Sequence, residues 1–120
     1  MHGLGELEAA VMDVLWHARE PLKVRQVLER LDTGKKLAYT TVLTVLDNLH
    51  RKDWVTRELE GNAYRYQPTI SRAEAAANAV RDVLIASGDP EAALLHFAQS
   101  ATAEESAVLR RALRRKASGR

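Results

Sequence analysis

The 120-residue sequence predicts a mainly α-helical fold with one small β-hairpin. Three observations support this fold class. Apolar residues recur at helical spacing in three segments of the first half, and a segment near the middle changes to a period of two around a glycine. Three helix-capping patterns then follow one another in the second half. We therefore expect three helices, a hairpin and three further helices.

The first segment, residues 4–18, predicts a helix with acidic residues in its first turn, where they suit the positive end of the helix dipole. Its apolar stripe consists of Leu4, Leu7, Val11, Val14 and Leu15, and Trp16 is expected in the core. Pro21 ends this pattern, because proline cannot continue a helix interior. A second helix is predicted from about Lys23 to Leu31, with Val24, Val27, Leu28 and Leu31 facing inward.

Residues 37–54 predict a third helix, whose two faces differ sharply in polarity. The apolar face consists of Val42, Val45, Leu46 and Leu49, and the polar face of Thr40, Thr41, Thr44, Asp47, Asn48 and Arg51. Taken alone, this stretch also fits an ordinary amphipathic helix with a polar outer face. Threonine is a mediocre helix former, however, and short hydroxyl side chains in a first turn can reach bases or phosphates in the major groove. We therefore interpret residues 37–54 as a recognition helix.

Two short segments of alternating polarity, residues 54–59 and 63–67, flank Glu60-Gly61-Asn62 and predict the hairpin. Asp53 is expected to end the preceding helix, because aspartate tolerates the left-handed backbone of a helix cap. Three short helices followed by a hairpin have the order of a winged helix-turn-helix, in which the hairpin lies beside the DNA backbone as a wing. The candidate phosphate-binding residues are Arg25, Arg57 and Arg65, and the alternative for each is a solvated surface arginine.

The second half predicts three helices joined by very short turns. Their starts are marked by a capping box at Ser71 to Glu74, by Asp89 with Pro90, and by a capping box at Thr102 to Glu105. So short a segment would be marginal as an independent domain, so we expect a second subunit to cover its apolar side chains. The candidate dimer interface consists of Val80, Val83, Leu84, Leu94, Leu95, Phe97, Val108, Leu109 and Leu113. The alternative is a monomer in which this segment folds back on the first half.

The predicted domains are a winged-helix DNA-binding domain at residues 1–69 and a helical dimerisation domain at residues 70–120. The net charge is only +2, so composition alone does not require a nucleic-acid partner. The segment from Arg110 to Lys116 concentrates basic residues near the end of the last helix, where the helix dipole favours cations. A tail that touches DNA is the alternative for this segment.

Composition and spacing argue against several other classes. The absence of cysteine excludes disulfide frameworks, zinc ribbons and cysteine nucleophiles. The four histidines have no metal-ligand spacing, and there is no nucleophile elbow or complete P-loop, so we expect no enzyme, metal or cofactor. No apolar run approaches the roughly 20 residues of a membrane span, and no signal-peptide pattern occurs. We expect a cytoplasmic protein without membrane insertion.

Four stretches together resemble the penicillinase repressor family (BlaI/MecI/CopY type), and the resemblance extends over nearly the whole chain. They are Gly5 to Trp16, Val24 to Leu28, Ala38 to Leu46 and Tyr64 to Pro68. The resemblance implies a homodimeric winged-helix repressor of inverted-repeat operator DNA, in a β-lactam-resistance or related stress-response regulon. It places the groove-reading surface on Tyr39, Thr40, Thr41 and Thr44, with backbone contacts near Arg25, Arg51 and the wing.

Three positions depart from the family pattern. Lys23 stands where the family usually has a Thr or Ser cap, Asp53 where a glycine usually ends the recognition helix, and Asn48 where arginine is common. The resemblance also implies a sensor-triggered protease that cuts the β-lactam-responsive members at an Asn-Phe bond. The matching residues here are His96 and Phe97, and the copper-responsive branch uses cysteines that this chain lacks. Neither inducer is supported by the residues.

A rival function is a winged-helix module that contacts proteins and does not recognise DNA sequence, because this fold does not by itself dictate DNA binding. Salt dependence separates the two functions, since phosphate contacts impose a steep loss of affinity with added salt.

Overall fold

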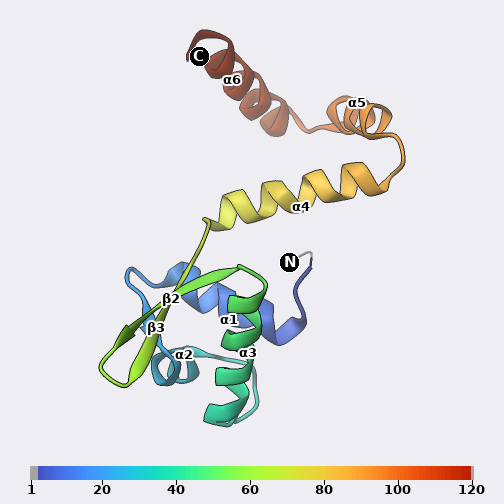
Figure 1. Ribbon diagram of the computed structural model, residues 1–120. Coiled ribbons are helices and arrows are strands. Elements are labelled where there is room, and N and C mark those ends of the chain that lie inside the picture. Colours follow the sequence, from blue (N-terminus) through green and yellow to red (C-terminus); the bar gives the residue numbers. More distant parts are fainter. Residues whose placement is uncertain (1–2, 120) are drawn as a thin grey trace. The chain divides into compact units, whose positions relative to one another are not determined.

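The computed structural model describes residues 3–119, which form six helices and one three-stranded antiparallel sheet (Figure 1). The predicted class, mainly α with a small β-hairpin wing, is confirmed. The chain divides into two compact units, one up to Ala79 and the other from Val80 onward. The elements are α1 (Glu6–His17), β1 (Leu22–Lys23), α2 (Val24–Arg30), α3 (Tyr39–Arg51), β2 (Val55–Glu60), β3 (Ala63–Pro68), α4 (Arg72–Ala86), α5 (Pro90–Ser100) and α6 (Ala103–Gly119).

The core of the first unit is formed by the apolar faces of α1, α2 and α3 together with the inner face of the sheet. Its buried residues are Val11, Met12, Leu15, Leu22, Val24, Val27, Val42, Val45, Leu46, Leu49, Val55 and Tyr66. The four apolar positions predicted for the third helix are all among them, so that helix buries one stripe and exposes the opposite one. Trp16 is half-buried and packs against the core, with its indole NH donating to the carbonyl oxygen of Ile70 at 3.0 Å.

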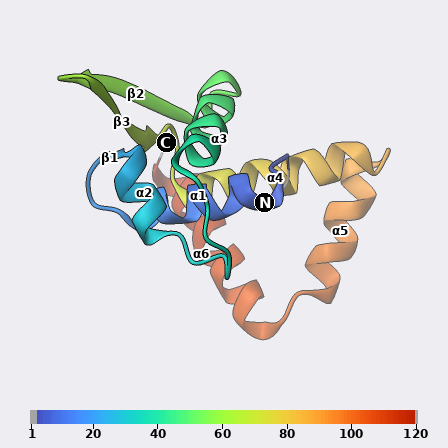
Figure 2. The same ribbon diagram turned by 90° about the horizontal axis from the view of Figure 1, so that it is seen from below.

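The sheet has the strand order β1-β3-β2, and the β2–β3 hairpin projects beyond the helices (Figure 2). Leu22 of β1 pairs with Tyr66, and Arg57 of β2 pairs with the same tyrosine from the other side. Strand β1 was not predicted, because two residues are too few to show an alternation. The predicted second helix accordingly begins one residue later than expected, at Val24.

Asp53 follows α3 with a φ of 64°, which is the left-handed conformation expected for it. Asp53→Val is predicted to lower the free energy of unfolding by about 1–2 kcal/mol, because a β-branched side chain is strained there. Asp53→Gly removes the strain and should stay within about 0.5 kcal/mol of the wild type. Thermal or urea unfolding of the three proteins tests this, and equal stability of the valine and glycine variants would contradict it.

Glu8 joins the start of α1 to the end of α3. Its carboxylate accepts from the Gly5 amide and from Lys52 Nζ, both at 2.9 Å. These two partners lower the pKa of Glu8 below its ordinary value of 4.5, the Gly5 amide contributing most.

A lowered pKa in the folded state means that Glu8 stabilises the fold above its ordinary pKa of 4.5, and that this contribution is lost as the pH falls through the folded value. Glu8→Gln is therefore predicted to cost about 0.5–1 kcal/mol at pH 7 and to cost less at acid pH. Urea unfolding between pH 7 and pH 3 tests this. A difference between the two proteins that stays constant over this range would contradict it.

The first turn of α4 is fastened to α1. Arg72 forms an ion pair with Asp13 and lies over the Trp16 ring, its guanidinium carbon 5.1 Å from the ring centroid. Ala75, one turn later, is buried. The first turns of α4 therefore belong to the first unit, and the structural division falls inside this helix.

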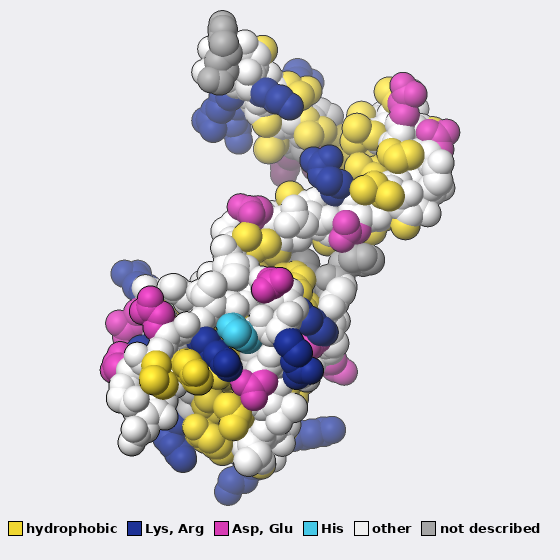
Figure 3. Space-filling model, viewed as in Figure 1, with side chains coloured by type: hydrophobic (Ala, Val, Ile, Leu, Met, Phe, Trp, Pro, Cys, Tyr) yellow, Lys and Arg dark blue, Asp and Glu magenta, His cyan; other side chains and the backbone are white. Residues whose placement is uncertain are grey.

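The second half of the chain has the three predicted helices, α4 to α6. At the start of α4 the Ser71 hydroxyl accepts from the Glu74 amide at 3.1 Å, but among the described residues the reciprocal bond of the predicted capping box is absent. The Asp89 carboxylate accepts from the Ala92 amide, and Thr102 and Glu105 form a reciprocal capping box. Between Val80 and Gly119, however, none of the described side chains is buried. Apolar side chains lie on the surface of α5 and α6 (Figure 3), among them Leu94, Phe97 and Leu113, each more than half exposed. Ile85 is exposed as well, although the predicted interface did not include it.

Candidate nucleic-acid interface

The polar face of α3 begins with two exposed threonines. Thr40 and Thr41 lie in the first turn, and among the described residues neither hydroxyl has a hydrogen-bond partner. Thr44 is also exposed, but its hydroxyl donates to the Thr40 carbonyl oxygen at 2.9 Å. The hydroxyls of Thr40 and Thr41 are therefore free both to donate and to accept, whereas Thr44 can only accept without breaking a bond.

The start of α3 lacks a capping side chain. Its N-cap is Ala38, which makes no side-chain hydrogen bond to the first turn. Alanine is a poor N-cap compared with Ser, Thr, Asp or Asn. The Thr41 amide donates to the Ala38 carbonyl oxygen at 3.1 Å, whereas the amides of Tyr39 and Thr40 have no partner among the described residues. These two amides are available to a phosphate oxygen, and the helix dipole favours a negative charge at this end.

Arg25 of α2 and Tyr39 of α3 meet beside this helix start. The guanidinium carbon of Arg25 lies 5.4 Å from the centroid of the Tyr39 ring, and the tyrosine is 40% exposed. This cation–π contact holds the arginine over the ring and leaves its N–H groups to solvent or to a ligand. Arg25 and Tyr39 are 14 positions apart in the sequence and were predicted as DNA-binding residues independently of each other, and in the structure they form one surface.

Asn48 and Arg51 form a pair near the end of α3. The Arg51 guanidinium donates to the Asn48 side-chain oxygen, one helical turn away. Asn48 is one of the departures from the family pattern, and here it orients a cation. An asparagine that binds Arg51 through a neutral oxygen leaves the full positive charge of the arginine available.

Arg57 fastens the wing to α3. Its guanidinium donates to the Asp47 carboxylate at 3.2 Å and lies over the Tyr64 ring, 4.2 Å from the centroid. The hydroxyl of Tyr66 is buried nearby without a hydrogen-bond partner. Burial raises the pKa of this hydroxyl, and the neighbouring Arg57 cation partly opposes the rise. Arg57 is therefore held in place before any ligand arrives.

Arg65 is also engaged within the protein. It forms an ion pair with Glu60 across the hairpin and donates to the Pro21 carbonyl oxygen at 3.2 Å. The pairing lowers the pKa of Glu60 and raises that of Arg65, in each case chiefly through their mutual hydrogen bond. Lys23 Nζ adds a second cation 3.9 Å from the Glu60 carboxylate. The site thus carries two positive charges around one negative charge.

The structure brings the nine predicted residues into three groups. Arg25 and Tyr39 flank the start of α3 with Thr40, Thr41 and Thr44, Asn48 and Arg51 pair near its end, and Arg57 and Arg65 are held on the wing. Sequence reasoning missed Tyr64, which carries Arg57 on its ring. The alternation of β3 could have found it, because Tyr64 and Tyr66 are two residues apart and share one face.

Sequence comparison identifies known relatives of this chain. A family model described as "Penicillinase repressor" matches residues 4–115. The chain belongs to the penicillinase repressor family. Two Mycobacterium tuberculosis proteins called "Transcriptional regulator BlaI", from strains CDC 1551 / Oshkosh and ATCC 25618 / H37Rv, are each 47% identical over 113 residues. The match covers 92% of this chain and 82% of each relative.

The fold of the first unit has a solved counterpart. The solution structure of the DNA-binding domain of the repressor BlaI matches with a TM-score of 0.52 and 24% identity, covering 60% of this chain and 87% of that one. The match supports the winged-helix fold predicted for this member of the penicillinase repressor family. In the part of the chain that the structure describes, no three His, Asp or Glu side chains are grouped to hold a metal ion. No helix there is long and apolar enough to cross a bilayer.

Proposed function

We propose that this chain is a DNA-binding transcriptional repressor whose α3 reads base edges in the major groove. The observation that carries the proposal is the open first turn of α3, where Thr40 and Thr41 present unpaired hydroxyls beside an uncapped helix start. Membership in the penicillinase repressor family supports it. The role requires no catalytic residue, metal or cofactor, and it places the protein with DNA in the cytoplasm.

The proposed repressor acts as a homodimer on an inverted-repeat operator. The support is the second unit, whose apolar residues have no core of their own among the described residues. The interface is proposed to comprise Val80, Val83, Leu84, Leu94, Leu95, Phe97, Val108, Leu109 and Leu113, to which we add Ile85. A two-fold axis would present two α3 helices to successive turns of the duplex, about 34 Å apart.

The proposed domain roles follow the predicted division, with DNA binding in residues 1–69 and dimerisation in residues 70–120. Regulation of a β-lactam-resistance or related stress-response regulon, and release by a sensor-triggered protease, stay predictions from the family resemblance. His96 and Phe97 are exposed and lie within α5. A protease would therefore need to unwind this helix before it could hold the bond in an extended conformation.

Arg65→Ala is predicted to weaken binding to operator and to shuffled DNA alike, by about three- to tenfold, and to flatten the salt dependence of both. The reason is that a wing arginine contacts phosphates, which carry no sequence information. Each phosphate that is no longer neutralised lowers the slope of log K against log salt by about 0.9. Fluorescence anisotropy at several salt concentrations measures this. A reduction confined to operator DNA would contradict the assignment.

The experiment that tests the proposed function is fluorescence anisotropy of the purified protein with DNA from upstream of its own gene and with a shuffled control, each at two salt concentrations. Tighter, salt-sensitive binding to the upstream DNA is expected. If neither this DNA nor other candidate operators from the genome bind more tightly than the shuffled control, the winged helix is a protein-binding module and the DNA-contact residues are wrong. Sedimentation equilibrium of the same sample tests the dimer.

A further inference from the structure

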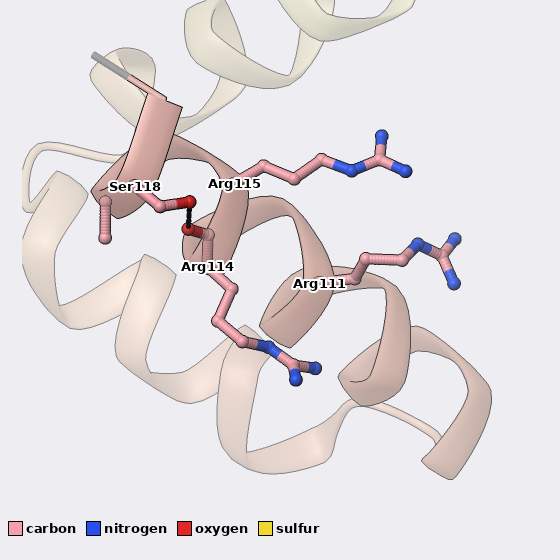
Figure 4. Close-up of a pocket in the computed structure, with 5 residues that line it drawn as sticks. Arg111, Arg114, Arg115 and Ser118 are labelled. Carbon is pink, nitrogen blue, oxygen red and sulfur yellow. Dashed lines mark hydrogen bonds between the residues drawn. The ribbon is translucent and has the colours of Figure 1, made fainter.

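Four arginines gather on one side of α6. Arg110 and Arg114 are one turn apart, as are Arg111 and Arg115, and at 100° per residue all four fall within about 140° of the helix circumference. All four are exposed. Figure 4 shows Arg111, Arg114 and Arg115 extending outward from the helix. Together with Ala117 and Ser118 they line an open depression of about 560 Å³.

The two leucines of the proposed dimer interface on the same helix, Leu109 and Leu113, lie on the opposite side from the arginine arc by the same helical geometry. Val108, the third interface residue on α6, lies at the edge of the arc next to Arg115. A partner subunit that covers the leucines would thus leave the arginines facing outward. The arginine face and the apolar face can be occupied at the same time.

Neither the helix dipole nor internal ion pairs account for this face. The dipole favours cations within the last turn of a helix, but Arg110 and Arg111 lie about two turns before the end of α6 at Gly119. Glu104 and Glu105, the acidic residues of α6, are in its first turn. Across the described residues, none of the four arginines forms an ion pair with an acidic side chain. Four like charges at this spacing repel one another and lower helix stability unless an anion binds them.

We infer that the arginine face of α6 binds the phosphate backbone of duplex DNA and forms a second contact surface besides the winged helix. Guanidinium groups bind phosphate oxygens in a bidentate manner, and lysines would serve equally well for solubility alone. Arginines one turn apart are separated by about 6 Å along the helix, and the duplex carries a charge every 1.7 Å or so of its axis. This inference rests on the proposed function, because it adds non-specific affinity to a protein that already meets DNA.

The test compares full-length variants by anisotropy with the upstream DNA and the shuffled duplex, at several salt concentrations. Arg111→Gln with Arg115→Gln removes two charges from the arginine face. Arg81→Gln with Lys116→Gln removes two exposed charges from the same unit outside that face and serves as the matched control. Arg111→Lys with Arg115→Lys keeps the charges, and sedimentation equilibrium checks that every variant keeps the oligomeric state of the wild type.

The glutamine pair on the arginine face is expected to weaken binding to both duplexes by about tenfold and to lower the salt slope by about 0.9 for each phosphate that is no longer neutralised. The lysine pair is expected to stay within about threefold of the wild type, because an ammonium group also neutralises a phosphate. The control pair is expected to stay within the same range, because charges that do not contact the DNA act weakly through salt. Equal effects of the two glutamine pairs would overturn the inference, because they would reduce it to net charge.

Two further outcomes separate this inference from the proposed function. If the wild type binds its operator and the Arg111→Gln, Arg115→Gln variant binds equally well, the proposed repressor function stands and the α6 contact alone is overturned. A wild-type protein that binds no duplex overturns both. Co-sedimentation with phosphatidylglycerol vesicles is measured in parallel. If the Arg111→Gln, Arg115→Gln variant loses binding to vesicles and keeps its binding to DNA, the arginine face contacts an anionic membrane surface and the DNA contact is overturned.

Discussion

Thr41→Ala is expected to lower the affinity for operator DNA by about five- to thirtyfold, which corresponds to roughly 1–2 kcal/mol, and to leave the affinity for shuffled DNA unchanged. Its hydroxyl is exposed in the first turn of α3 and has no hydrogen-bond partner among the described residues, so it is available to a base edge. Alanine is a better helix former than threonine, so the substitution does not weaken α3. A reduced affinity, measured by anisotropy on both duplexes, would therefore report an interaction of the Thr41 side chain with DNA.

Two further variants sharpen the Thr41 experiment. Thr41→Ser keeps the hydroxyl and loses the methyl group, so recovery in the serine variant would assign the interaction to a hydrogen bond, and no recovery would assign it to the methyl group. Thr33→Ala removes an exposed threonine whose hydroxyl already donates to the Lys35 carbonyl oxygen, and it is expected to have little effect. Equal losses on operator and shuffled DNA for Thr41→Ala would contradict base reading by this residue.

Leu46→Ala is expected to lower the free energy of unfolding of the first unit by about 2–5 kcal/mol. Leu46 is fully buried on the inner face of α3, where the three helices and the sheet meet. Its removal loses the transfer free energy of the side chain and leaves a cavity that the surrounding core fills only in part. Because the same helix carries the proposed base-reading residues, DNA affinity at 37 °C should fall together with the folded fraction.

Urea unfolding followed by tryptophan fluorescence measures this destabilisation, since Trp16 and Trp54 pack against the same core. Leu59→Ala is the matched control, because Leu59 lies on the wing and is 64% exposed. The control should change stability by less than about 0.5 kcal/mol. Similar losses of stability in the two leucine variants would show that burial on α3 does not determine the stability of this unit.

Much of the fold was predictable because its signals are local. The stripe from Val42 to Leu49, the left-handed Asp53 and the capping box at Thr102 each depend on residues no more than about seven positions apart. An α-helix repeats every 3.6 residues and caps itself through side chains three positions away, so such features appear directly in the sequence. The polar face of α3, and with it the proposed base-reading residues, followed from the same periodicity.

Partners distant in the chain were not predictable. Arg57 and Arg65 were chosen as phosphate ligands from their places on a hairpin, but the sequence contains no sign that they meet Asp47, Tyr64, Glu60 and the Pro21 carbonyl oxygen. The ion pair of Glu8 with Lys52 spans 44 residues. An exposed arginine has several acidic side chains within its possible reach, and only the packing of helices and strands decides which of them it meets.

The sequence by itself determined the order of the elements, the inward face of each helix in the first unit and the helix caps, because short-range periodicity and backbone chemistry decide these features. Only the tertiary structure decided that Leu22 and Lys23 form a third strand, that Arg25 lies over Tyr39, and that α4 is fastened to α1 through Arg72. The physical reason is that a strand pair, a cation–π contact or an ion pair between elements forms only after hydrophobic burial has brought the elements together.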